Sequence, residues 1–186
     1  MRVSLAFIGL LLLTATFRLC FAQEAEWVKF ESKAGSFSVL MPAQPTEEKK
    51  TTTTTDTLGK PVSYTSNLYI ARGDGEIYGA GWVDYQAGYR FDPKKELELN
   101  RDNFVKGVKA NLTGSKDITL GAYQGFEFTA QTDEMFFKSQ VFIVGLRPYM
   151  LIHVFKTENA PTSKKFFSSF HVAPKVLFHH SGNHTL

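Results

Sequence analysis

The chain has 186 residues, of which 43% are hydrophobic and 14% are aromatic, and its formal net charge is +3. This composition favours one well-filled core and excludes a largely disordered chain. No basic stripe stands out along the sequence, so we expect no nucleic-acid partner.

Residues 1–22 have the pattern of a secretory signal peptide. Arg2 supplies the positive start, residues 3–13 are apolar, and Cys20 and Ala22 place small residues before a cleavage site at Gln23. The apolar run is too short for a comfortable membrane span, so we expect membrane contact only through this segment if it stays uncleaved. The alternative is a lipoprotein signal with Cys20 as the lipidated residue. Either way, we expect an exported protein, periplasmic or extracellular.

Cleavage after residue 22 would leave a single domain over residues 23–173, with a tail at 174–186 that we predict to be disordered. Cys20 is the only cysteine, so the mature chain would hold no disulfide and no thiolate metal site. Removing Arg2 and Arg18 from the 21 basic residues would leave one more basic than acidic residue, so the mature chain is close to neutral.

Four stretches in the first half of the chain predict strands: 27–30, 37–41, 62–71 and 77–85. The five threonines at 51–55 are compatible with a flexible loop or an exposed strand, and the β-branched side chains favour the strand.

The sequence Asp92-Pro93 predicts the start of one long helix, with Asp92 as the cap and Pro93 in the first turn. Apolar residues then recur at helical spacing on one side: Leu97, Phe104, Val105, Val108 and Leu112. We predict an amphipathic helix that packs on a sheet and ends near residues 111–114.

The stretch from Gly125 to Val172 predicts three consecutive strands, at 125–130, 141–144 and 149–155, and a closing helix. Asn159 and Pro161 suit the start of this helix, and Phe166 and Phe170 share a face that should pack on the sheet. The predicted fold class is therefore α+β: a mostly antiparallel β-sheet with helices packed on both faces.

The order of these parts, from Trp27 and the 35–45 segment through Asp92-Pro93 to Phe170, resembles the small secreted bacterial proteins related to PsbP, the extrinsic subunit of photosystem II. The resemblance covers residues 27–172. It implies an α/β/α sandwich, shared with the Ran-binding Mog proteins of the nucleus. Known members of that fold are mostly non-enzymatic assembly or binding proteins, and no functional residue of theirs can be matched to a position here.

An aromatic stretch at 78–91 is the strongest candidate for a binding site. It is interrupted by glycines, and exposed aromatic rings can stack on sugars or pack against a partner. The alternative is that the rings fill the core. The residues we predict for binding are Tyr78, Trp82, Tyr85 and Tyr89.

Histidines and carboxylates give weaker candidates. His153 and His171 are candidates because histidine as a class can change charge near neutral pH, and a position at a sheet edge is the favoured interpretation for such a strand histidine. Three histidines near the C-terminus are more typical of a solvated tail than of a metal site, so we expect no metal: His179, His180 and His184. Four carboxylates surround the predicted helix without any sign that they meet: Asp84, Asp92, Glu96 and Asp102.

Two short patterns have a common local explanation. Residues 72–74, Arg-Gly-Asp, fall in a predicted turn, where such residues are usual. Asn111 and Asn183 match the N-glycosylation pattern, which arises often by chance.

No nucleophile elbow, phosphate loop, dinucleotide fingerprint or metalloprotease helix occurs in the sequence. We therefore expect a non-enzymatic, exported binding or assembly-accessory protein of the cell envelope, without a cofactor, whose partner is a protein or another envelope component. The alternatives are a small-molecule or glycan binder that uses residues 78–91, and an enzyme with a carboxylate or histidine site. The sequence leaves the oligomeric state open.

Overall fold

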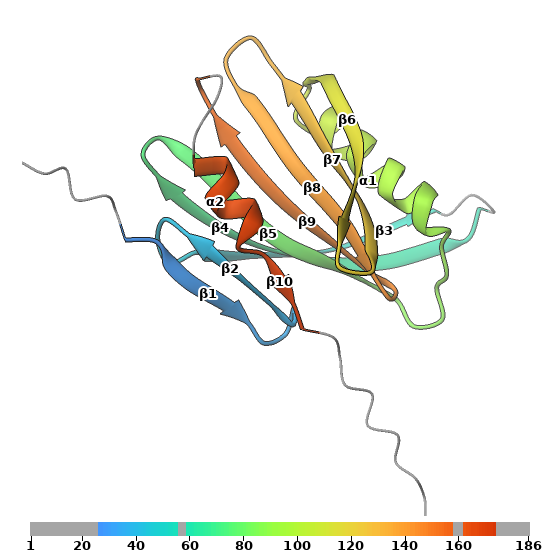
Figure 1. The fold of residues 1–186 in the computed structure, drawn as a ribbon. Helices are drawn as coiled ribbons and strands as arrows, with labels where there is room; N and C mark the ends of the chain where they lie inside the picture. Colours follow the sequence, from blue (N-terminus) through green and yellow to red (C-terminus); the bar gives the residue numbers. More distant parts are fainter. Residues whose placement is uncertain (1–25, 56–58, 158–161, 174–186) are drawn as a thin grey trace, which may run out of the picture.

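The computed structural model describes residues 26–55, 59–157 and 162–173 (Figure 1). These residues form strands for most of their length and two helices. In chain order, the elements are β1 (Val28–Ser32), β2 (Phe37–Met41), β3 (Thr46–Thr55), β4 (Pro61–Gly73), β5 (Glu76–Tyr85), α1 (Pro93–Gly107), β6 (Asn111–Leu120), β7 (Tyr123–Gln131), β8 (Phe136–Val144), β9 (Arg147–Phe155), α2 (Thr162–Ser168) and β10 (His171–Val172).

The strands form two antiparallel sheets. The larger has seven strands in the order β3-β4-β5-β9-β8-β7-β6, so β9 lies at its centre. The smaller sheet has the order β1-β2-β10 and lies against one face of the larger one, together with α2 (Figure 1). Most neighbouring strands of the large sheet are consecutive in the chain and form hairpins. The pairing of β5 with β9 joins the two halves of the chain.

Because successive side chains of a strand point to opposite faces, the core residues lie on both faces of the large sheet. We name the side that carries the small sheet the Trp82 face. There Trp82 and Phe142 pack with Phe37 of β2 and Phe170, which follows α2. The opposite side is the α1 face, where α1 packs on β7 and β8 through a second cluster: Leu97, Phe128, Val141 and Ile143, with Phe104 beside them.

The start of α1 confirms the prediction, and its end does not. Asp92 lies before the helix in an extended conformation, and its Oδ1 accepts a hydrogen bond of 2.9 Å from the Lys95 backbone N–H. The helix ends at Gly107, and Lys109 adopts a positive φ of 53° that turns the chain. Residues 111–114, predicted as the helix end, instead begin β6, because their backbone groups pair with β7.

The predicted fold class, an α+β sandwich with helices on both faces, is wrong, because the fold is β-rich. The antiparallel sheet exists, but only helices of 15 and seven residues accompany it in the described chain. On the Trp82 face, β2 buries Phe37, Val39 and Met41 and so supplies much of the cover expected from a helical layer. Residues 51–55, for which the sequence left loop and strand open, are strand. Residues 111–114, predicted as a helix end, are strand as well.

The threonine run confirms the strand interpretation, since residues 51–55 complete β3 and pair with β4. The Arg-Gly-Asp segment closes the β4–β5 hairpin, where Asp74 and Gly75 have positive φ angles of 52° and 78°. The segment predicted as a signal peptide, the residues from 174 onward, and Asn159 and Pro161 lie outside the described residues.

Candidate functional site

The structure separates the four residues predicted for binding into two pairs. Tyr78 and Trp82 lie on the Trp82 face of β5 and are only 1% and 4% exposed, so they belong to the core there. Tyr85 ends the same strand on the α1 face, and Tyr89 lies in the following loop. The separation of Trp82 from Tyr85 fits strand geometry, because residues an odd number apart point to opposite faces.

Tyr85 is held by α1. Its hydroxyl donates to the carboxylate of Glu96, which is buried and also accepts a hydrogen bond of 2.8 Å from Asn100 Nδ2. Burial, and after it the hydrogen bond to Glu96, raise the pKa of the Tyr85 hydroxyl. The Tyr85 ring lies 4.8 Å from that of Tyr89 and 5.5 Å from that of Phe91, so the three rings form one cluster.

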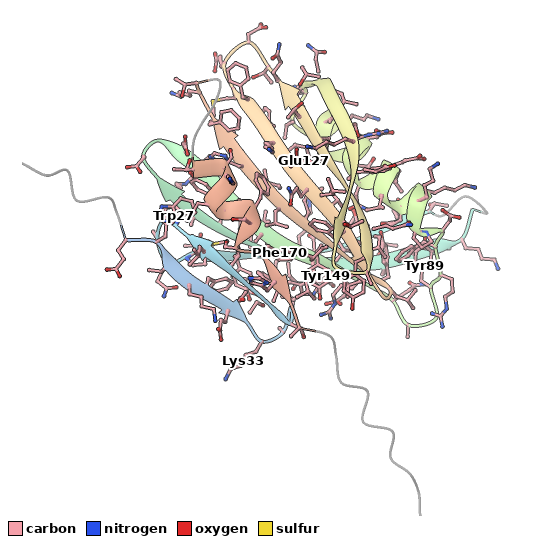
Figure 2. All side chains as sticks on the ribbon, viewed as in Figure 1. Trp27, Lys33, Tyr89, Glu127, Tyr149 and Phe170 are labelled. Carbon is pink, nitrogen blue, oxygen red and sulfur yellow. The ribbon has the colours of Figure 1, made fainter. Side chains whose placement is uncertain are left out.

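Tyr85 and Tyr89 line an open hollow of about 620 Å³ at one end of the large sheet. We name it the tyrosine-lined hollow. Tyr123 and Tyr149 contribute to it, and Figure 2 shows Tyr89 and Tyr149 towards the same end of the molecule. Its remaining walls are the loop after β5, at 86–90, the β8–β9 turn at 144–146, and residues 36 and 173 beside the small sheet.

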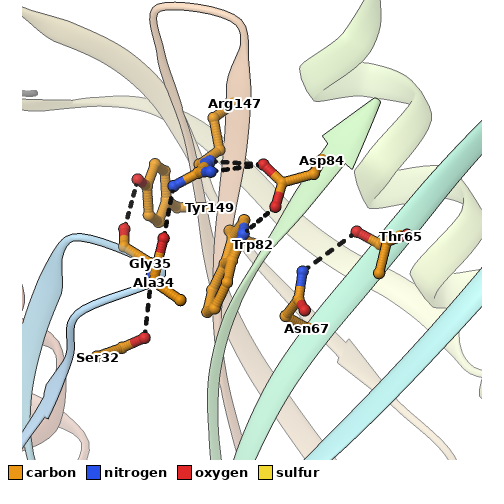
Figure 3. A network of polar contacts seen from close by, with 9 residues as sticks. All are labelled: Ser32, Ala34, Gly35, Thr65, Asn67, Trp82, Asp84, Arg147 and Tyr149. Atoms are coloured by element: carbon orange, nitrogen blue, oxygen red, sulfur yellow. Dashed lines mark hydrogen bonds and ion pairs between the residues drawn. The ribbon is translucent and has the colours of Figure 1, made fainter. Parts of the chain in front are cut away.

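Asp84 and Arg147 form the charged wall of the tyrosine-lined hollow (Figure 3). Arg147 Nε and Nη2 lie 2.8 Å and 2.6 Å from Asp84 Oδ1, and the Trp82 indole donates to Asp84 Oδ2 at 2.6 Å. The guanidinium also lies 5.5 Å from the centre of the Trp82 ring. The ion pair is only partly buried, so its polar atoms stay near solvent on the hollow side.

The same network fixes the small sheet to the large one. Arg147 Nη1 donates to the carbonyl of Ala34 at 3.0 Å, and the Tyr149 hydroxyl donates to the carbonyl of Gly35 at 2.7 Å (Figure 3). Both acceptors lie in the β1–β2 turn. Neither Arg147 nor Tyr123 stood out in the sequence, because an arginine in a turn and a tyrosine at the start of a strand carry no local signal.

His153 was expected at a sheet edge, and this interpretation is wrong. It lies on β9, the central strand, and its side chain is not exposed at all. Both ring nitrogens have partners, Ser163 Oγ and Glu76 Oε2. No local pattern indicates this burial, because Glu76 is 77 residues away from His153 in the sequence.

The other candidates show no shared site. Asp92 caps α1, Asp102 contacts its neighbour Arg101 at the surface, and Glu96 binds Tyr85, so the carboxylates around the helix do not converge. Among the described residues, no group of histidine, cysteine and carboxylate side chains could hold a metal ion. The histidines at 179, 180 and 184 lie outside the described residues, as does Asn183.

No helix in the described part of the chain is both long enough and apolar enough to cross a membrane. No protein-family model matches this sequence, and no curated protein is detectably similar to it.

Proposed function

We propose that the protein is an exported binding protein of the cell envelope, and that its ligand is a saccharide unit held in the tyrosine-lined hollow. The observation that carries the proposal is the meeting of Tyr85, Tyr89 and Tyr123 with the Asp84–Arg147 ion pair around one hollow. Export rests on the signal-like sequence at 1–22.

The chemistry of the hollow suits a sugar. Tyrosine rings offer flat apolar area, against which the C–H face of a pyranose packs, and they lose little conformational freedom on binding. The Asp84 carboxylate accepts hydrogen bonds from sugar hydroxyls, and the Arg147 guanidinium donates to them. A mainly apolar hollow with a few fixed polar groups is the usual composition of a small-molecule site.

The first test compares Tyr89→Ala with wild type. The wild-type mature chain is screened by thermal shift against soluble envelope-derived oligosaccharides, and the best ligand is titrated by calorimetry. We expect Tyr89→Ala to weaken binding about 10-fold, which corresponds to about 1.4 kcal/mol, because one stacking ring is lost. Its melting temperature should stay close to that of wild type, since Tyr89 lies in a loop and not in either core cluster.

Tyr64→Ala is the matched control. Its ring lies 5.8 Å from that of Tyr85, yet Tyr64 does not line the hollow. It should therefore keep wild-type affinity, and an equal loss in both variants would show that disturbed packing, not a lost ligand contact, explains the effect. If no saccharide shifts the melting temperature of the wild-type chain, the proposal is wrong.

A further inference from the structure

A buried histidine joins a hydroxyl to a carboxylate on the Trp82 face. His153 Nδ1 lies 2.6 Å from Ser163 Oγ in α2, and His153 Nε2 lies 2.9 Å from Glu76 Oε2 at the start of β5. The same carboxylate oxygen accepts hydrogen bonds from the Tyr78 hydroxyl and from Thr162 Oγ1, the latter at 2.8 Å. The distant strand β5 thus meets β9 and the following helix α2 at His153.

The protonation states follow from these contacts. Burial raises the pKa of Glu76, but hydrogen bonds from Tyr78, Thr162 and His153 outweigh it and leave the pKa below its usual value. Glu76 is therefore a carboxylate and only accepts, so the ring proton lies on His153 Nε2. Nδ1 then carries a lone pair that accepts the Ser163 hydroxyl proton.

The imidazole is neutral and fixed in position. Burial lowers the pKa of His153, although its hydrogen bond and charge interaction with Glu76 act against this, and the charge of Lys138 lowers the pKa further. The Tyr78 ring stacks on the imidazole, with ring centres 4.3 Å apart and an interplanar angle of 16°. A neutral base, oriented by a carboxylate and hydrogen-bonded to a hydroxyl, is the arrangement that activates a nucleophile.

Ser163 lines a hollow of about 840 Å³, together with residues of β7 and β8. Glu127, labelled in Figure 2, also lines this hollow. Lys138 lies 3.4 Å from the Glu127 carboxylate, Lys164 is exposed, and four aromatic rings provide apolar walls: Phe136, Phe137, Phe155 and Phe167. It shares no lining residue with the tyrosine-lined hollow.

We propose that Ser163 is the nucleophile of an esterase site, with His153 as general base and Glu76 as the group that orients it. The substrate class is a carboxylic ester with an apolar acyl group, because aromatic rings form much of the lining of the hollow. This goes beyond the binding function and departs from the expectation that the protein is not an enzyme. It rests on separate residues, so either proposal can fail alone.

The reaction balances with water as the only co-reactant. Ser163 Oγ attacks the ester carbonyl carbon while its proton moves to His153 Nδ1, and the carbonyl π electrons move to oxygen. The tetrahedral intermediate collapses, the carbon–oxygen bond to the leaving group breaks, and Nδ1 returns the proton to the departing alcohol. Water then attacks the acyl-Ser163 ester by the same steps in reverse order, releasing a carboxylic acid and free Ser163. Glu76 remains a carboxylate throughout.

The competing explanation is that these hydrogen bonds only anchor α2 to the sheet. Thr162 and Ser163 both start this seven-residue helix and both bind the cluster, and a helix so short needs tertiary contacts to form. A serine hydroxyl that only anchors the helix has ordinary reactivity. An activated serine nucleophile reacts with electrophiles that do not react with ordinary serines.

The test is labelling of the mature chain with a fluorophosphonate probe, followed by peptide mapping. Attack by Ser163 Oγ displaces fluoride and leaves a stable phosphonyl adduct, which mass spectrometry locates. We expect labelling at Ser163, loss of at least about 100-fold in labelling rate in Ser163→Ala, and a slower rate in Glu76→Gln. Hydrolysis of a p-nitrophenyl ester with an apolar acyl chain should fall in parallel.

Ser115→Ala is the control, because Ser115 is an exposed serine on β6 that lines neither hollow. It should label at the wild-type rate. If folded wild-type protein takes up no probe, or if the adduct maps to other serines, the hydrogen bonds only anchor α2 and the proposal is wrong. The mapping of the wild-type adduct decides this even if Ser163→Ala does not fold.

Discussion

His153 shows how one buried side chain links stability to pH. Burial keeps its folded-state pKa below the usual 6.5 despite Glu76, and Lys138 acts in the same direction as burial. The unfolded chain therefore binds a proton at this site before the folded protein does, so the free energy of unfolding should fall as the pH drops below about 6.5. Glu76 adds to the loss at lower pH, because its folded pKa lies below the ordinary 4.5.

We expect the free energy of unfolding to be nearly constant between about pH 8 and 7 and to decrease from about pH 6.5 downward. His153→Gln should flatten the decrease between about pH 6.5 and 5, since glutamine does not titrate. Urea unfolding at a series of pH values measures this. His171→Gln, at an exposed position on β10, should leave the profile unchanged, and an unaltered profile in His153→Gln would contradict the assignment.

At the scale of elements, the features that could be predicted from the sequence are those that depend on residues close together in the chain. The cap of α1 follows from Asp92 and Pro93, and the hairpin at Gly145, whose φ is +65°, follows from a turn residue between apolar runs. The end of α1 was misplaced because Val108 and Leu112 continue a helical spacing. Pairing of residues 111–120 with β7 satisfies more backbone groups than another helical turn would, and no local signal reports such pairing.

The cap of α1 gives a prediction at this scale. Asp92→Ala removes the acceptor for the Lys95 backbone N–H and should lower the free energy of unfolding by about 1 kcal/mol, while Asp92→Asn should change it little. Chemical denaturation measures the difference. Asp102→Ala is the control on the same helix: its exposed carboxylate contacts only Arg101 in the surface ion pair, so we expect less than about 0.5 kcal/mol. Equal losses would refute capping as the cause.

At the scale of the whole molecule, the two polar clusters could not be predicted from the sequence, because they form between segments that are distant in the chain. Arg147 and Asp84 are 63 residues apart, and Glu76 and His153 are 77 apart, so neither cluster leaves a pattern in any window of sequence. Tyr78 and Trp82, two of the four residues predicted for binding, belong to the core, because the Trp82 face of β5 packs against the small sheet. That sheet is completed when β10 returns to pair with β2.

Phe170 connects the two sheets and so tests whether they unfold together. Its side chain is 2% exposed, and its ring lies 5.5 Å from that of Phe37 in the small sheet and 6.1 Å from that of Tyr149 in the large one. Phe170→Ala should lower the free energy of unfolding by about 3–5 kcal/mol, because it leaves a cavity between the sheets. Leu99→Ala, at a side chain that is 52% exposed, should change it by less than about 0.5 kcal/mol.

Since one core cluster contains residues of both sheets, we also expect wild type and Phe170→Ala to unfold in a single transition. Thermal melts followed by far-UV circular dichroism, for backbone structure, and by near-UV circular dichroism, for aromatic packing, should then coincide. Two separated transitions would show that the large sheet stays folded after the small sheet detaches. In that case Arg147 and Tyr149, which bind the β1–β2 turn, would join two independently stable units instead of completing one core.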